Sequence, residues 1–301
     1  MASTNIGWEL YRSFLGVLNE GSLSGAARAL DITQPTVGRH IAALEQALGL
    51  LLFTRSQAGL LPTEAATSLR GHAEALQSTV AALERAAASQ GGNGEIKGVV
   101  RISCSDVIGV EVLPPVITRL REAHPELKIE LVLTDRVQDL LSREADIAVR
   151  MVQPKQEQLV ARRIGRILLG LHASRDYLER HGTPSTVDDL ARHSAIGYDQ
   201  TTAWLRQAEK SLKVMRRDLF SLRSDSSLAQ LALIRAGAGI GMCQVPLGRR
   251  ERNLVRVLPR AVQLPLETWV TMHEDLRSSP RCRVAFDALV EGLLGYLGPS
   301  D

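Results

Sequence analysis

From residue 22 to residue 48, the hydrophobic positions repeat at the spacing of two short helices separated by a tight turn. Ser22 is a natural N-cap for the first helix, and Asp31 begins the turn that ends it. Thr33 caps the second helix, whose first turn contains Pro35, where a missing N–H has no cost. The second helix buries one stripe, made of Val37, Ile41, Leu44 and Leu48. The pattern predicts a helix-turn-helix, followed by a hairpin that ends near residue 63.

The second helix is expected to present a polar surface near its N-terminal end, formed by Gln34, Thr36, Gly38, Arg39 and His40. Gln pairs bidentately with adenine, Arg pairs with guanine, and a Thr methyl packs against a thymine methyl. The start of a recognition helix is where such contacts to base edges are made. The predicted DNA-binding set is therefore Ser22, Thr33, Gln34, Pro35, Thr36, Gly38, Arg39 and, in the hairpin, Arg55.

This stretch resembles the winged helix-turn-helix of LysR-type transcriptional regulators. The matching residues are Phe14-x-x-Val17, Gly21-Ser22-Leu23-Ser24-x-Ala26-Ala27-x-x-Leu30, Gln34-Pro35-x-Val37, Ile41-x-x-Leu44-Glu45-x-x-Leu48-Gly49, Leu52-Phe53-x-Arg55 and Pro62-Thr63. A match spread over so many positions is more specific than a single motif. The sequence departs from the family pattern at two positions. Gly38 stands where the family usually has Ser, so a side-chain contact is absent there. Ala66 stands where the family usually has Gly.

Residues 64–89 carry a second hydrophobic pattern, with apolar positions at alternating steps of four and three. Such a seam is typical of a coiled coil rather than of a helix packed on a globular core. Three heptads are also compatible with an ordinary amphipathic helix that covers a domain. The position between two domains favours a dimerising linker helix, with Leu69, Leu76, Val80 and Leu83 at the contact.

Beyond residue 95, short hydrophobic runs alternate with amphipathic segments, which predicts βαβ units and a largely parallel sheet. Strands are expected at 99–104, 128–133, 146–150 and 164–173, and helices at 114–123 and 136–143. A second lobe is expected to continue the alternation up to residue 258. Residues 266–273 then return the chain to the first lobe, where residues 281–297 form a terminal helix.

The second region resembles the periplasmic-binding-protein-like effector domain of the same regulators, through Leu113-Pro114-Pro115, His124-Pro125-x-Leu-x-Ile-x-Leu, Asp146–Val149 and Arg235–Met242. The resemblance implies an α+β multidomain fold. An all-α winged helix-turn-helix head (1–63) precedes a linker or dimerisation helix with a flexible joint (64–94) and a two-lobed α/β effector-binding domain (95–301). Lobe I is expected at about 95–167 and 270–301, and lobe II at about 168–269.

Ligands of open α/β sheets bind in the crevice at the carboxyl ends of the strands. Small polar residues follow three predicted strands and Arg150 ends another, which predicts a site for a small anionic metabolite between the lobes. The candidate residues are Ser103, Cys104, Ser105, Thr134, Arg150, Ser224 and Ser226. Ser and Thr at these positions are equally typical of helix N-caps. Arg150 equally fits an ion pair with Asp146 or a solvent-exposed position.

Charge and composition narrow the class of protein. The chain of 301 residues has a net charge of +3, but residues 1–93 hold six Arg, no Lys and seven acidic residues, a net charge of −1. Nonspecific DNA binders usually have a basic surplus, so a few well-placed arginines must serve here. Three cysteines at unrelated spacings and the absence of a long apolar run indicate a reduced cytoplasmic protein without a membrane span. No metal and no cofactor is expected.

Enzyme motifs are not supported by the sequence. Gly237-x-Gly239-x-Gly241 follows a predicted helix, the reverse of a dinucleotide fingerprint, and no Walker A or Gly-x-Ser-x-Gly sequence occurs. The resemblance instead implies a homodimer or homotetramer that binds double-stranded DNA at an interrupted palindromic promoter site and responds to a small-molecule effector. The alternative is a cytosolic small-molecule-binding protein, or an enzyme, with a helical appendage.

Overall fold

The computed structural model describes residues 6–56, 59–88, 96–134, 145–154, 159–200, 205–206, 208, 212 and 216–298. Contacts divide the chain into two compact units, one within residues 1–90 and one within residues 91–301, apart from a short stretch at 142–144 that lies outside the described residues. Each unit has a hydrophobic core of its own. Among the described helices, none is long and apolar enough to span a bilayer.

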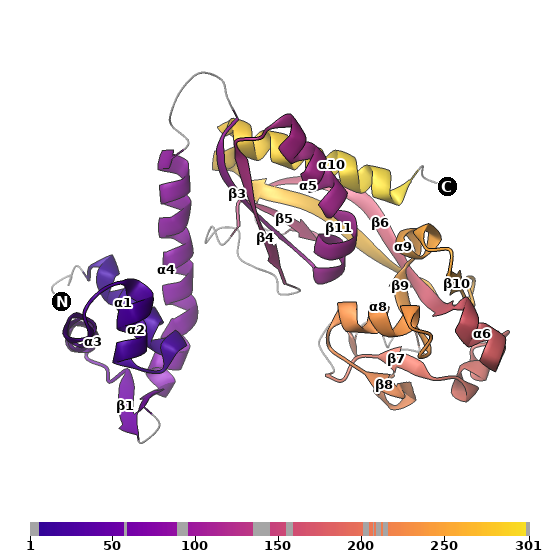
Figure 1. Cartoon of the computed structure of the whole chain (residues 1–301), viewed down its shortest axis with the longest axis horizontal. Coiled ribbons are helices and arrows are strands. Elements are labelled where there is room, and N and C mark those ends of the chain that lie inside the picture. The colour runs from indigo at the N-terminus through magenta and orange to yellow at the C-terminus, as the bar shows by residue number, and fades with distance from the viewer. Residues whose placement is uncertain are drawn as a thin grey trace. The chain divides into compact units, whose positions relative to one another are not determined.

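The first unit is a helical head with a two-stranded wing (Figure 1). Its elements are α1 (Trp8–Glu20), α2 (Leu23–Leu30), α3 (Gln34–Leu48), the antiparallel strands β1 (Phe53–Ser56) and β2 (Gly59–Pro62), and α4 (Glu64–Ala88). The core lies where α1, α2 and α3 meet, and its largest fully buried side chains are Phe14, Leu44 and Leu52.

The turns of the head follow from single residues that end each helix. Gly21 and Gly49 adopt φ values of 67° after α1 and α3, a left-handed conformation that glycine adopts without strain. Asp31 ends α2 with φ of 55°. Ser22 and Thr33 accept hydrogen bonds from the N–H groups of Gly25 and Thr36, so the predicted N-caps of α2 and α3 are confirmed.

Helix α4 uses the two halves of its hydrophobic seam differently. Leu69 and the buried Ala73 pack against the core of the head. Leu76 and Leu83 are exposed, at 37% and 67% of their surface, and Val80 is half-buried. The Arg70 guanidinium also donates to the Leu18 carbonyl, which anchors the first turns of α4 to the end of α1. Half of the seam therefore covers the head, and the other half remains accessible in the single chain.

The second unit is built on one mixed sheet. Among the described residues its strands are β3 (Gly98–Cys104), β4 (Leu127–Leu133), β5 (Ile147–Arg150), β6 (Leu159–Ser174), β7 (Ala195–Gly197), β8 (Leu222–Arg223), β9 (Ile240–Gln244), β10 (Leu254–Arg256) and β11 (Leu264–His273). Their order is β4-β3-β5-β11-β6-β9-β7-β8, and β10 pairs with β6.

Strand direction divides this sheet into two lobes joined by two crossing strands. Pairing is parallel within β4-β3-β5 and within β9-β7-β8. The long strands β6 and β11 run antiparallel to each other and to their neighbours β5 and β9. The expectation of a largely parallel sheet is therefore wrong for the whole sheet, because the strands that cross between lobes must return in the opposite direction.

Helices cover both lobes of the second unit. In the first lobe, α5 (Pro114–Ala123) and α10 (Pro280–Leu297) pack on the sheet, and the short π-helix η1 (Ile108–Val112) follows β3 (Figure 1). In the second lobe lie α6 (Arg175–His181), α8 (Ser227–Arg235) and α9 (Val245–Arg250), with the 3-10 turns η2 (Asp188–Arg192) and η4 (Arg217–Leu219). A further 3-10 turn, η5 (Glu274–Ser278), precedes α10.

Most elements of the second unit agree with the sequence expectation to within a few residues, including α5, β5 and α10. The predicted strand at 164–173 begins earlier, as β6 spans Leu159–Ser174. The helix predicted at 136–143 lies outside the described residues.

Candidate nucleic-acid interface and ligand cavity

The first turns of α3 form an exposed polar surface, as the sequence predicted. Thr33, Gln34, Pro35 and Arg39 are exposed, and Thr36 and Gly38 are half-buried. Thr36 Oγ1 lies 2.8 Å from Thr33 Oγ1 and accepts from Arg39 Nη2 at 3.3 Å. This chain of hydrogen bonds holds the Arg39 guanidinium beside the helix N-terminus, where N–H groups favour an anion such as phosphate.

One member of the predicted outward-facing set points elsewhere. His40 Nδ1 lies 2.7 Å from the Oγ of Ser13, a residue of α1 that is buried in the head. The expectation that His40 faces outward is therefore wrong, since this hydrogen bond ties α3 to α1. The Nδ1 atom of His40 is therefore used within the head.

The wing is fixed to α3 by one carboxylate. Glu45 Oε1 accepts from the backbone N–H groups of Leu52 and Phe53, at 2.7 and 3.2 Å, and thereby positions the start of β1. The N–H of Leu60 in β2 donates to the Gly21 carbonyl at the turn between α1 and α2. Arg55 belongs to β1, but its side chain lies outside the described residues.

Gly38 is a testable weak point of α3, because the helix has room for a side chain there. A Cβ at this position meets only Leu23 Cδ1, at 3.8 Å, which is an ordinary contact. Glycine within a helix is less favourable than alanine by about 0.5–1 kcal/mol. We expect Gly38→Ala to slow amide hydrogen exchange in α3 about threefold. Gly49→Ala, at a φ of 67°, should accelerate the exchange; equal effects would contradict this account.

A cavity of about 560 Å³ lies between the two lobes of the second unit. The first lobe contributes the residues that follow β3 and β5, and the second lobe contributes α8 and the end of β9. Its described lining consists of Ser105, Val107, Thr134, Val149, Arg150, Met151, Val152, Leu169, Tyr198, Gln200, Leu205, Asp225, Ser227, Gln230, Leu231, Met242, Cys243, Gln244, Leu247 and Leu266. Most of these side chains are apolar, as is usual for a small-molecule site.

Three of the predicted effector-binding residues line this cavity: Ser105, Thr134 and Arg150. Among the described lining residues, Arg150 is the single cation. Arg150 Nη2 donates to Ser103 Oγ at 2.8 Å and Nη1 donates to the Val149 carbonyl at 3.0 Å. Ser103 itself is fully buried beneath Arg150, so it orients the guanidinium instead of lining the cavity.

The other three predicted residues do not line the cavity. Cys104 is completely buried in the core of the first lobe, because it is the last residue of an interior strand. Ser226 caps α8 by accepting from the Ala229 N–H, and Ser224 Oγ accepts from the Ser226 N–H. Their hydroxyls therefore serve the turn before α8, which corrects their predicted placement in the crevice.

Asp225 and Ser227, which belong to the same polar run as Ser224 and Ser226, do line the cavity, together with Gln230 and Gln244, which the sequence reasoning missed. Ser227 and Gln230 are three residues apart in α8 and therefore share one helix face. That spacing was the available signal. Asp225 Oδ1 accepts from the N–H groups of Asp199 and Gln200, so this carboxylate also orders the segment after β7.

Cys243 lines the same cavity but is a poor candidate for a reactive thiol. It is buried, and burial raises its pKa to about 12. A thiol with so high a pKa carries almost no thiolate at neutral pH, and the thiolate is the reactive form.

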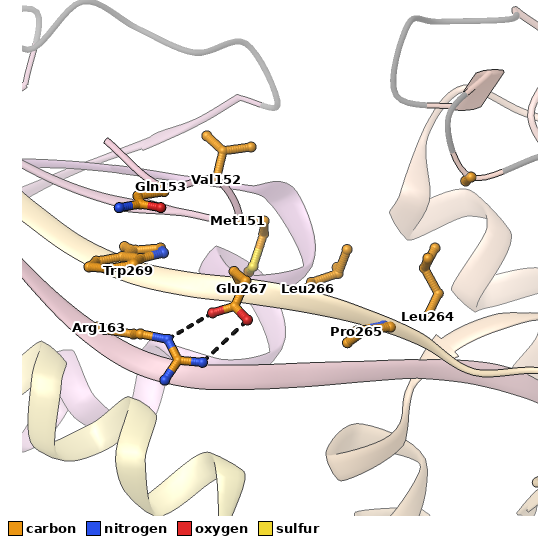
Figure 2. Close-up of a pocket in the computed structure, with 10 residues that line it drawn as sticks. Met151, Val152, Gln153, Arg163, Leu264, Pro265, Leu266, Glu267 and Trp269 are labelled. Carbon is orange, nitrogen blue, oxygen red and sulfur yellow. Dashed lines mark hydrogen bonds and ion pairs between the residues drawn. The ribbon is translucent and has the colours of Figure 1, made fainter. Parts of the chain in front are cut away.

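A second cavity, of about 740 Å³, lies along β11 and is lined by Met151, Val152, Trp269 and the pair Arg163–Glu267, among others (Figure 2). Figure 2 shows the Arg163 guanidinium donating twice to Glu267, at 2.8 and 3.2 Å. Arg166 donates to the same carboxylate at 2.6 Å. Glu267 already pairs with both cations. This cavity therefore has less positive charge available to bind an anionic ligand than the cavity that contains Arg150.

The two lobes are linked beside the first cavity by a three-residue ion cluster. Arg235, at the end of α8, donates to Glu111 of η1 at 2.8 and 2.7 Å and to Glu251 at 2.6–3.1 Å. Its hydrogen bonds lower the pKa of Glu111, and the two carboxylates raise the pKa of Arg235. Glu111 belongs to the first lobe and Arg235 to the second, so we name this cluster the interlobe ion cluster.

A winged helix-turn-helix joined to a two-lobed domain with an internal cavity defines a class of protein, the ligand-responsive DNA-binding regulators. Comparison with known families agrees. Residues 8–67 match the family described as bacterial regulatory helix-turn-helix protein, lysR family, and residues 93–294 match the LysR substrate binding domain. The chain therefore belongs to the LysR family of transcriptional regulators.

Individual relatives support this assignment over nearly the full length. The transcriptional regulator CrgA of Neisseria meningitidis is 30% identical over 290 residues, which cover 93% of this chain and 95% of CrgA. The transcriptional activator TtdR of Escherichia coli is 28% identical over 295 residues, 95% of this chain and 93% of TtdR. The solved structure of CrgA matches with a TM-score of 0.58, at 25% identity, over 95% of this chain and 98% of that chain.

A further structural neighbour, CbnR crystallised with its target DNA, matches with a TM-score of 0.65 over 95% of this chain and 99% of that chain. At 17% identity it shows a shared fold.

Proposed function

We propose that this regulator reads double-stranded DNA with the first turns of α3. The N-terminal end of α3 carries this proposal, because Gln34 and Arg39 are exposed there and Arg39 is hydrogen-bonded to Thr36. These three residues contact base edges. The other residues of the DNA-binding set lie at the sugar-phosphate backbone of the DNA or close against it: Ser22, Thr33, Pro35, Gly38 and Arg55. The CbnR–DNA complex, a relative of the same fold, supports this use of the head.

Arg39→Ala is expected to weaken binding to the cognate promoter by about 1–3 kcal/mol and to relax sequence preference, because a bidentate contact to guanine is lost. Arg39→Lys is the matched control, since it keeps the charge but not the planar fork. It should retain nonspecific affinity and still lose specificity. Fluorescence anisotropy with cognate and scrambled duplexes at two salt concentrations measures both. If Arg39→Ala bound all duplexes as the wild type does, Arg39 would make no base contact.

The proposed assembly is a homodimer, or a homotetramer of paired dimers, on an interrupted palindrome. The accessible part of the α4 seam supports it, because Leu76 and Leu83 are exposed apolar residues one heptad apart. Val80 lies between these two leucines on the seam, whereas Leu69, which the sequence also placed at the contact, packs against the core of the head. We assign residues 1–63 to the head, 64–94 to the linker and 95–301 to the effector-binding domain, with lobe boundaries near 168 and 270.

The proposed effector is a small carboxylate held in the cavity that contains Arg150. A guanidinium on an otherwise mostly apolar wall is suited to one carboxylate on an apolar body. Ser105 and Thr134 supply hydroxyls from the same lobe, and Ser103 orients Arg150 through its 2.8 Å hydrogen bond. The effector acts by binding one arrangement of the lobes more tightly than another.

Arg150→Met is expected to raise the dissociation constants of small carboxylates about tenfold to a hundredfold, because a charge-assisted hydrogen bond is lost. Arg150→Lys keeps the charge and should lose less affinity. DNA binding without effector should stay within twofold of the wild type, and a melting temperature near that of the wild type shows that the variants fold. Calorimetric titration with a panel of monocarboxylates measures the affinities, and unchanged affinities for every acid that binds would place the site elsewhere.

We further propose that the protein acts in the cytoplasm, where bacterial DNA lies, and that it is not an enzyme. Its function as a family member is regulation. No group of three or more His, Cys, Asp or Glu in the described part of the chain is arranged to hold a metal ion. Turnover of any acid in the binding panel would favour the alternative of an enzyme with a helical appendage.

A further inference from the structure

Two buried glutamines line the interlobe cavity from the second lobe. Gln230 of α8 is 3% exposed and Gln244, at the end of β9, is 6% exposed. Buried polar side chains normally have all their hydrogen-bonding groups satisfied. Each of these amides uses one of its two polar atoms within the protein and leaves the other without a partner among the described residues.

Gln230 presents an acceptor. Its Nε2 donates to the Ser224 carbonyl oxygen at 2.7 Å, and a carbonyl accepts but never donates, which fixes the orientation of the amide. Gln230 Oε1 has no hydrogen-bond partner among the described residues. The atom is not completely covered by the protein either. Gln230 Oε1 therefore retains some accessible surface, and Gln230 is one of the residues that line the cavity.

Gln244 presents a donor. Its Oε1 accepts from the Tyr296 hydroxyl at 2.7 Å, across from the terminal helix α10. The hydroxyl is the donor in this bond because an amide oxygen only accepts, and burial raises the pKa of Tyr296, so the phenol keeps its proton. Arg250 packs over the Tyr296 ring, 4.6 Å from its centre, and holds the phenol in place. Gln244 Nε2 is left without a hydrogen-bond partner in the part of the chain that the structure describes. This atom, too, is not completely covered by the protein.

Charges assign the two ends of a ligand to the two lobes. Arg150 lines the cavity from the first lobe, and the Asp225 carboxylate lines it from the second. A ligand carboxylate is therefore attracted to the first lobe and repelled from the second. The second lobe also contributes Tyr198, Gln200 and Ser227, and the Tyr198 and Ser227 hydroxyls lie 3.3 Å apart. Among its buried side chains it offers one amide acceptor and one amide donor, which suit a neutral group that both donates and accepts.

We propose that the effector is a carboxylic acid that also carries a hydroxyl or a carboxamide, bound between Gln230 Oε1 and Gln244 Nε2. The proposal rests on the proposed function, which places an acid in this cavity. Hydrogen-bonding sites reject analogues that lack the polar group, because the buried partners are then left unsatisfied. Gln230 and Gln244 are thus specificity-determining residues, and Tyr296 is a positioning residue that orients Gln244.

The test uses the full-length protein and matched acids that differ at one position. One series is hexanoate, 6-hydroxyhexanoate, 6-aminohexanoate and the monoamide of hexanedioic acid. A second is 3-phenylpropanoate with the same substituents on the ring. Calorimetric titration should find that, in the series that binds, the hydroxyl or carboxamide member binds at least about tenfold more tightly than the unsubstituted member.

Variants then locate the discrimination. Gln230→Met and Gln244→Met should bind the unsubstituted acid at least as tightly as the wild type does, because the amide left unsatisfied is gone, and should lose most of the preference for the substituted one. Tyr296→Phe should reduce the preference in part. Gln263→Met is the matched control, because exposed Gln263 also donates to a backbone carbonyl, that of Pro259, but does not line the cavity. Melting temperatures near that of the wild type show that the variants fold.

Each outcome has one meaning. If acids bind but the unsubstituted members bind as tightly as the substituted ones, or if the Met variants keep the preference, the inference is wrong and the proposed function stands. A preference for the ammonium members also overturns it and indicates recognition by Asp225. If no acid binds the wild type, the proposed carboxylate effector is wrong, and this inference fails with it.

Discussion

The double variant Leu76→Asp/Leu83→Asp is expected to sediment as a monomer and to lose at least about a hundredfold in affinity for a palindromic promoter. The two leucines are 37% and 67% exposed in the single chain and lie one heptad apart on α4. In a dimer they would be covered, and a carboxylate buried there without a partner costs several kcal/mol. A monomer then reads a single half-site, which explains the loss of affinity.

The choice of these two positions follows from the head. Leu69 and Ala73 belong to the same seam, but they already pack against the core of their own domain. Substituting them would unfold the head and mimic a loss of dimerisation. Leu76→Met/Leu83→Met and Gln77→Asp are the controls, the first apolar on the seam and the second charged beside it; both should remain dimeric. Analytical ultracentrifugation that finds an intact dimer of the Asp variant would place the assembly on another surface.

The recognition helix shows how far local patterns carry a prediction. Ser22, Thr33 and the buried stripe of Val37, Ile41 and Leu44 are where the sequence placed them, because caps and helical periodicity depend on near neighbours. His40 was placed wrongly. Its exposure depends on Ser13, 27 residues earlier, and no pattern within α3 reveals that partner.

The cavity shows the limit of the same reasoning. Of the small polar residues that follow strands, Ser105 and Thr134 line the cavity, but Ser224 and Ser226 serve the turn before α8. The residues that line the second lobe's wall, Gln230 and Gln244, are not small and come from the interior of a helix and from a strand that meets α10. Their role depends on how the crossing strands bring two lobes together, which is a property of the tertiary fold.

The interlobe ion cluster provides the second large expected effect. Arg235→Met should lower the free energy of unfolding of the second unit by about 1–3 kcal/mol at pH 7, because Glu111 and Glu251 then lose their common partner. The side chains are partly buried, with 36% of Arg235 and 18% of Glu111 exposed, so the loss exceeds that of a surface pair. The matched control is Arg216→Met, whose partner Asp218 is 60% exposed, and which should cost less than about 0.5 kcal/mol.

The pH dependence distinguishes this cluster from ordinary packing. Arg235 lowers the pKa of Glu111 in the folded protein, so the folded state binds a proton less readily than the unfolded state does. The stabilisation from Glu111 is therefore complete above the ordinary glutamate pKa of about 4.3 and is lost as the pH falls through the lower folded pKa. In Arg235→Met the two carboxylates face each other without a cation, which reverses the direction of the shift. The difference in unfolding free energy between wild type and Arg235→Met should thus be large at pH 7 and shrink below pH 4 in urea titrations. A difference that stayed constant with pH would mean that Arg235 contributes through packing of its aliphatic stem and not through its charge.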